Sequence, residues 1–109
     1  MDQKRLQELL SRIEKHPTNV LDRFVLAKMY FENQMWNETI HACQEALHLK
    51  PDYLVVQIML GEAFLRTNQY SSARDTLHTA KETATRQNHM GMIPEIEGLL
   101  EEIPDYSTF

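Results

Sequence analysis

The pattern of small, apolar and aromatic side chains in this sequence recurs after 34 positions. The stretch LAKMYFENQMW, residues 26–36, matches LGEAFLRTNQY, residues 60–70, in the sizes of its side chains, and the small Ala27 returns as the small Gly61. The other matched pairs are Leu26 and Leu60, Tyr30 and Phe64, Trp36 and Tyr70, Thr39 and Ala73, Cys43 and Leu77, Ala46 and Ala80, and Pro17 and Pro51. A period of this length predicts a chain built from repeated supersecondary units.

Apolar residues recur at helical spacing along almost the whole chain, so the expected fold class is all-α. Leu6 and Leu9, for example, share one face of a helix that must end before Pro17. We expect one helical domain over residues 1–103, followed by a short tail, residues 104–109. The expected helices cover about residues 3–15, 20–33, 37–49, 53–67, 71–86 and 93–103.

Polar residues at the expected helix ends predict how the helices begin and turn. Thr18 or Asn19 can cap the second helix, Asn37 the third and Asp52 the fourth, because such side chains accept hydrogen bonds from free backbone N–H groups. Asn68 supplies a residue that tolerates a left-handed turn after the fourth helix.

The small residues at recurring positions have a packing reason. Two antiparallel helices approach closely only where the contact lacks bulky side chains. Ala27 and Gly61 are therefore expected to face small residues on the second helix of each pair. Those small residues are Thr39, Ala46, Ala73 and Ala80.

The charge distribution argues against a nucleic-acid partner. Residues 1–51 carry 7 basic and 7 acidic side chains, whereas residues 52–109 carry 4 basic and 9 acidic ones. Between Glu95 and Asp105, five carboxylates occur without a lysine or arginine. A surface that binds nucleic acid needs clustered positive charge, so no nucleic-acid partner is expected.

A cytoplasmic location and no membrane contact are expected. The single cysteine, Cys43, excludes an internal disulfide and fits a reducing compartment. Its counterpart in the recurrence is Leu77, so a buried apolar role is expected rather than a reactive thiol. The opening MDQKRLQELL lacks the apolar core of a secretory signal, and no stretch approaches the roughly 18 apolar residues of a membrane span.

No pattern of residues predicts catalysis, a metal ion or a cofactor. His41 and His48 share a helix face, but the segment offers no third ligand. The carboxylates that follow Glu95 lack the loop of alternating oxygen ligands that binds calcium. Only three glycines occur, and none forms a phosphate-binding loop. We therefore expect a protein that is not an enzyme and that holds no cofactor or metal.

The recurring residues resemble those of tetratricopeptide repeats. The resemblance rests on Leu26-Ala27, Tyr30, Trp36, Thr39, Ala46 and Pro51, and on Leu60-Gly61, Phe64, Tyr70, Ala73 and Ala80. It implies two full repeats, about residues 20–53 and 54–87, between a half-repeat helix and a capping helix. The implied architecture is a right-handed α–α superhelix, a solenoid of about six antiparallel helices.

In this family the first helix of each repeat lines a concave groove, so the resemblance implies a protein partner. The groove should be mainly apolar and suited to an amphipathic helix or an extended apolar peptide. One family branch clamps a C-terminal carboxylate with Lys, Asn and Arg, but Phe24, Lys28 and Met59 stand where Lys, Asn and Asn would be needed. The expected groove residues are Leu21, Phe24, Lys28, Phe31, Glu32, Val55, Ile58, Glu62, Leu65 and Arg66.

Other ways of covering this groove stay open. The expected apolar row consists of Phe24, Phe31, Ile58 and Leu65. The chain's own C-terminal helix can cover it, or the tail that carries Tyr106 and Phe109. A second copy of the chain can cover it too, which would make the protein a self-associating structural module, a homo-oligomer. A weaker alternative is an accessory of a chaperone or secretion system. The partner and the pathway do not follow from the fold.

Overall fold

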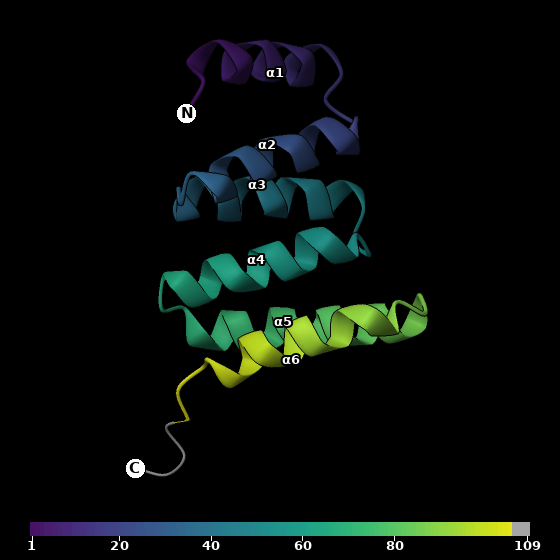
Figure 1. Ribbon diagram of the computed structural model, residues 1–109. Helices are drawn as coiled ribbons and strands as arrows, with labels where there is room; N and C mark the ends of the chain where they lie inside the picture. Colours follow the sequence, from purple (N-terminus) through teal and green to yellow (C-terminus); the bar gives the residue numbers. More distant parts are fainter. Residues whose placement is uncertain (106–109) are drawn as a thin grey trace.

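The computed structural model describes residues 1–105, which form six α-helices and one turn of 3₁₀ helix and contain no strand (Figure 1). The elements are α1 (Gln3–Lys15), α2 (Val20–Glu32), α3 (Trp36–Leu49), α4 (Leu54–Arg66), α5 (Tyr70–Arg86), η1 (Met90–Met92) and α6 (Ile93–Glu101). The expected all-α class is confirmed. The tail residues Tyr106 and Phe109 lie outside the described part of the chain.

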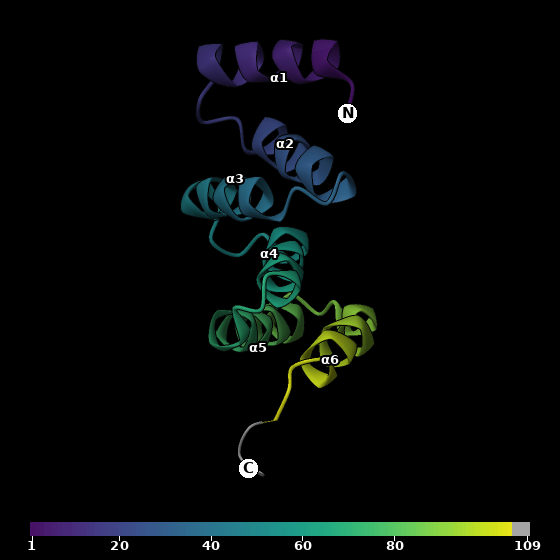
Figure 2. The same cartoon turned by 90° about the vertical axis from the view of Figure 1, so that its left-hand side faces the viewer.

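The helices stack in two layers, with α3 and α5 in one and α2, α4 and α6 in the other, and α1 lies across the α2 end of the stack (Figure 2). Within its layer α4 contacts both α2 and α6, and across the layers it contacts α3 and α5. The Cα radius of gyration is 14.6 Å, larger than the roughly 13 Å of a compact chain of this length. The stack is therefore open and elongated, 48 × 30 × 20 Å.

The repeat register holds from α2 to α5 and then slips. The first helices of the two repeats begin at Val20 and Leu54, 34 residues apart, whereas α6 begins at Ile93, 39 residues after Leu54. The η1 turn lies in this longer connection. Despite the slip, α6 contacts α4 and α5, as α4 contacts α2 and α3. The capping helix therefore occupies the place of the first helix of a third repeat.

Two of the expected helix caps are wrong. Asn19 does cap α2, because its side-chain oxygen accepts a hydrogen bond from the N–H of Asp22, at 3.3 Å. Helix α3, however, begins at Trp36, so Asn37 lies inside its first turn, and neither α3 nor α4 has a side-chain cap. The carboxylate and carbonyl of Asp52 instead accept hydrogen bonds from Gln87, at the end of α5.

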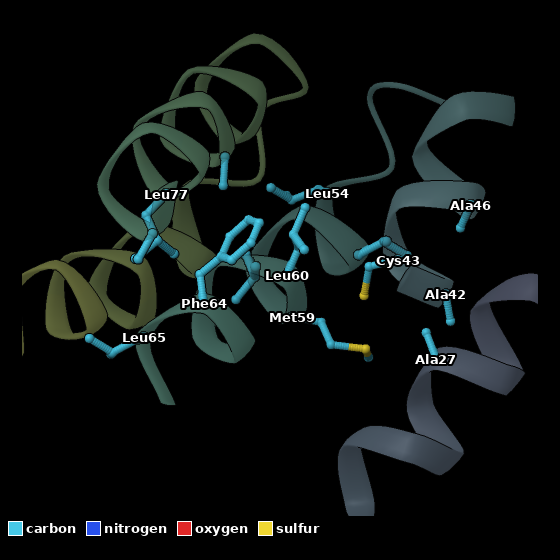
Figure 3. Close-up of a cluster of buried hydrophobic side chains, with 14 of the residues drawn as sticks. Ala27, Ala42, Cys43, Ala46, Leu54, Met59, Leu60, Phe64, Leu65 and Leu77 are labelled. Atoms are coloured by element: carbon cyan, nitrogen blue, oxygen red, sulfur yellow. The ribbon is translucent and has the colours of Figure 1, made fainter. Parts of the chain in front are cut away.

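The helix pairs approach closely at the small residues, but one contact differs from the expectation. Ala27 on α2 is fully buried, as are Thr39, Ala46, Ala73 and Ala80. Gly61 does not face a small residue: a Cβ at this position would lie 2.5 Å from Cδ2 of Leu77. The absence of a side chain on α4 therefore makes room for a large one on α5, and Leu77 lies beside α4 in the core (Figure 3).

Candidate functional site

The layer of α2, α4 and α6 contains a hollow. Figure 2 shows α4 set back between α2 and α6, so this side of the stack is concave. The hollow has a volume of about 170 Å³, and its walls come from α2, α4, η1 and α6. Its lining residues are Phe31, Val55, Ile58, Met59, Glu62, Met92 and Glu95. Five of these side chains are apolar and two are carboxylates, so we call it the concave hollow and treat it as the candidate site.

Two aromatic contacts fix the α2 side of this face. The ring of Phe31 meets the ring of Trp36 edge-on, with centroids 5.4 Å apart. Nearer the start of α2, the ring of Phe24 lies tilted against Tyr53, at 5.5 Å. Aromatic pairs prefer such tilted and edge-to-face geometries. Because Trp36 and Tyr53 belong to the segments that follow α2, these contacts also fix the angle between successive helices.

Four of the expected groove residues line the concave hollow together. Phe31 is half-buried, Val55 is 37% exposed, Glu62 is half-buried and Ile58 forms part of the floor. The other six do not line it. These are Leu21, Phe24, Lys28, Glu32, Leu65 and Arg66.

Two of the four residues in the expected apolar row are buried. Ile58 is only 4% exposed and Leu65 only 5%. Helix α6 packs beside α4, and Leu65 points toward the olive ribbon of α6 (Figure 3). The chain's own last helix therefore covers part of the expected apolar row, whereas Phe31, Val55 and Met92 around the concave hollow keep some exposure. Leu21, by contrast, is 59% exposed at the start of α2.

Charged side chains tie α6 to α4 at one end of the hollow. Arg66 donates a hydrogen bond to Glu102 at 3.0 Å and another to Glu62 at 3.3 Å. The hydrogen bond to Glu102 is the main reason that the pKa of the Arg66 guanidinium is raised. The Arg66 guanidinium thus forms hydrogen bonds with two carboxylates, and the bond to Glu62 is the longer one.

Three residues of the site were not among the expected groove residues. Met59 was considered as a departure from the carboxylate clamp; it is mostly buried, at 9% exposed, yet it also forms part of the hollow. Met92 and Glu95 were missed because the 34-residue register breaks before α6. The only sequence signal for them is the proline at the first turn of the last helix, Pro94, which places them at its start.

Two further hollows lie where α3 borders the first two helices. One, of about 430 Å³, is lined mainly by Leu10, Ile13, Leu26, Tyr30 and Ala42, with five polar residues around them. The other, of about 340 Å³, opens between Pro17 and the end of α3. Arg23 and Glu45 line both; Arg23 is ion-paired with Glu45 and donates two hydrogen bonds to the Pro17 carbonyl. The charged and polar groups of Arg23, Glu45 and Pro17 therefore already have partners within the chain.

The cysteine of the chain belongs to the core. Cys43 is fully buried, as expected, and burial raises the pKa of its thiol to about 12. Among residues 1–105 no three His, Cys, Asp or Glu side chains gather in a way that could hold a metal ion. None of the helices in this part of the chain has both the length and the apolar character needed to cross a membrane.

The two-layer stack and its concave hollow define a helical-repeat solenoid. The sequence profile of the tetratricopeptide repeat matches residues 30–92, more than half of the chain. The chain therefore belongs to the tetratricopeptide repeat family, as its recurring residues indicated.

Comparisons with individual proteins agree with this assignment. The sequence is 26% identical over 96 residues to anaphase-promoting complex subunit 3 of Dictyostelium discoideum, covering 88% of this chain but only 9% of that protein. The fold is similar to that of the TPR2B domain in a complex of yeast Sti1 with an Hsp70 peptide, with a TM-score of 0.81 and 21% identity. That match covers 89% of this chain and 78% of the other, and it confirms the expected solenoid fold.

Proposed function

We propose that this protein is a non-enzymatic adaptor that binds a segment of another protein on its concave face. The observation that carries the proposal is the concave hollow, where apolar side chains from α2, α4 and η1 converge. Pockets for small molecules usually measure about 300–1,000 Å³, whereas this one has about 170 Å³. A space of this size suits one side chain of a docked peptide or helix better than a metabolite.

The two similar proteins support the same kind of partner. One is a subunit of the anaphase-promoting complex and the other is a domain in complex with an Hsp70 peptide. Both names describe association with other proteins. We propose that the present chain also acts through association, and that it does so in the cytoplasm, since a single buried cysteine fits a reducing compartment.

The contact residues we propose are the accessible members of the concave face. Phe31, Val55 and Met92 provide apolar contact around the hollow. Leu21 and Phe24 extend this surface along α2, and the exposed fraction of Leu21 makes it available to a longer segment. The charged groups that set the direction of the segment are Lys28, Glu32, Glu62 and Arg66.

The test is co-purification from a lysate of the source cell with three forms of the protein. Val55→Glu places a charge in the hollow, and Leu49→Glu makes the same change at a similarly exposed position near the end of α3. Both variants are first shown to be folded by circular dichroism. We expect the wild type and Leu49→Glu to retain the same protein, and Val55→Glu to lose it.

Light scattering on the same samples separates this role from self-association. If the wild type forms a dimer that Val55→Glu dissociates, and no other protein is retained, the concave face joins two copies of the chain and the adaptor role is wrong. Loss of the partner in Leu49→Glu alone would move the site to the hollows bordered by α3.

A further inference from the structure

The two carboxylates of the concave hollow, Glu62 and Glu95, differ in their hydrogen-bond partners. Glu62 receives one hydrogen bond, from Arg66, and Arg66 lies closer to Glu102 than to Glu62. Glu95 is exposed in the first turn of α6, and no ion pair or side-chain hydrogen bond joins it to another residue of the described chain. The helix N-terminus favours a carboxylate there, but that interaction leaves its outward oxygens available.

The hollow carries an excess of negative charge. No lysine, arginine or histidine is among the residues that line the hollow. The two charged residues that line the hollow, Glu62 and Glu95, are both acidic, a net of −2. The basic side chains of Lys50 and His89 line the adjoining hollow, which shares Val55 and Met92 with this one. Lys28, the basic groove residue on α2, lies one turn before Phe31 and does not line the hollow.

From this arrangement we infer that the segment bound in the concave hollow carries an apolar side chain next to a lysine or arginine. The inference rests on the proposed function and adds the chemical class of the partner to it. The apolar side chain enters between Phe31, Ile58 and Met92, and the neighbouring cation meets Glu95 and Glu62. A segment rich in Asp or Glu is disfavoured, because its carboxylates would lie against Glu95 and Glu62. Arg66, the cation beside Glu62, is already shared between Glu62 and Glu102.

Synthetic peptides test this inference without knowledge of the natural partner. Three fluorescent peptide pools of equal length each place Leu, Ile, Phe or Met at fixed positions and differ only in the residues between them. These are Lys and Arg in the first pool, Asp and Glu in the second, and Ser and Gln in the third. We expect the wild-type protein to bind the basic pool most tightly, and rising salt to weaken this binding because exposed charges are screened.

Charge-reversed variants show which residues cause the preference for the basic pool. Glu95→Lys changes a residue that lines the hollow, and Glu101→Lys makes the same change in net charge on the same helix outside it. We expect Glu95→Lys to weaken binding of the basic pool by roughly three- to tenfold and to improve binding of the acidic pool. Glu101→Lys should leave the order of the pools unchanged.

The outcomes distinguish this inference from the proposed function. If all three pools bind equally and Val55→Glu abolishes binding, the concave face binds protein segments but the charge inference is wrong. If Glu101→Lys has the same effect as Glu95→Lys, the preference comes from net charge and the inference is again wrong. If no pool binds and the wild type is a dimer, both the inference and the proposed function fail.

Discussion

At the scale of single residues, two glycines in helix interiors have opposite surroundings. Gly61 lies against Leu77, and a Cβ at Gly61 would come within 2.5 Å of the leucine Cδ2, whereas a Cβ at Gly98 would meet nothing within 4 Å. Alanine is the better helix former by about 1 kcal/mol at both sites. The two positions therefore separate the packing role of a glycine from its helix propensity.

Substitution of each glycine by alanine should shift stability in opposite directions. Gly61→Ala should destabilise the protein by roughly 0.5–2 kcal/mol, because overpacking costs about 1–3 kcal/mol and the gain in helix propensity offsets part of it. Gly98→Ala should stabilise it by about 0.5–1 kcal/mol. Urea denaturation measures both. Equal stabilisation by the two changes would show that α4 and α5 are not in close contact at Gly61.

The buried thiol of Cys43 gives a second residue-scale prediction. Because burial raises the pKa of the thiol from 9.0 to about 12, the unfolded chain loses this proton more easily than the folded chain. The contribution to stability is therefore unchanged below about pH 9 and falls as the pH rises from 9 toward 12. At pH 8, iodoacetamide should label Cys43 only as fast as the chain opens. Fast labelling of the native protein, without urea, would contradict the burial of this side chain.

At the scale of elements, the turns show how far the sequence predicts the structure. The left-handed turn after α4 was predicted from Asn68, whose φ is 60°. The matching position of the first repeat, Gln34, has nearly the same φ, 58°, although glutamine offers no local signal for it. The left-handed conformation of Gln34 can be predicted only from its position 34 residues before Asn68. The packing of the helices on either side, rather than the residue type, sets this backbone conformation.

This left-handed residue predicts a stabilising substitution. A left-handed conformation costs an ordinary residue roughly 1–2 kcal/mol, so Gln34→Gly should raise the free energy of unfolding by about 0.5–1 kcal/mol after the added freedom of the unfolded chain is subtracted. Glu38→Gly, within α3, is the control and should lose about 1 kcal/mol. Chemical denaturation of both variants gives the two values. A loss of stability in Gln34→Gly would mean that the turn is not left-handed.

The first repeat and the last helix differ in how well the sequence predicts the site. Phe31 and Val55 were found because the family places groove residues on the first helix of a repeat. Glu95 was missed because the inserted η1 turn shifts α6 by five positions from the 34-residue register. The burial of Ile58 and Leu65 was one of the alternatives left open, since a helix pattern gives the face of a residue but not what covers that face.

The helices should also differ in local stability. In α4, ten of 13 residues are buried, whereas in α1 only three of 13 are. The ion pair between Arg12 and Asp22 ties α1 to α2. Segments with few buried contacts open with the smallest free energy. Hydrogen exchange followed by mass spectrometry should therefore find the amides of α1 exchanging first and those of α4 last. Equal protection of the two helices would contradict this gradient.

At the scale of the whole molecule, the repeat formed by α4 and α5 has helices packed on both sides of it, α2 and α3 before it and α6 after it. The concave hollow remains open to solvent. Helix α4 contacts four other helices, so it forms the centre of the stack. The chain matches only 9% of its long relative, yet it contains every part of the hollow described above. We propose that the acidic residues of this hollow set the charge of the segment it binds.

The most direct test is to map the binding site by NMR. The ¹⁵N-labelled protein is titrated with the best-binding peptide of the basic pool, and the amide signals of all assigned residues are followed. We predict that the largest shifts occur around Phe31, along α4 from Val55 to Glu62, and from Met92 to Glu95. Shifts concentrated at Leu10, Tyr30 and His41 would place the site between α1 and α3 and contradict the assignment of the concave hollow.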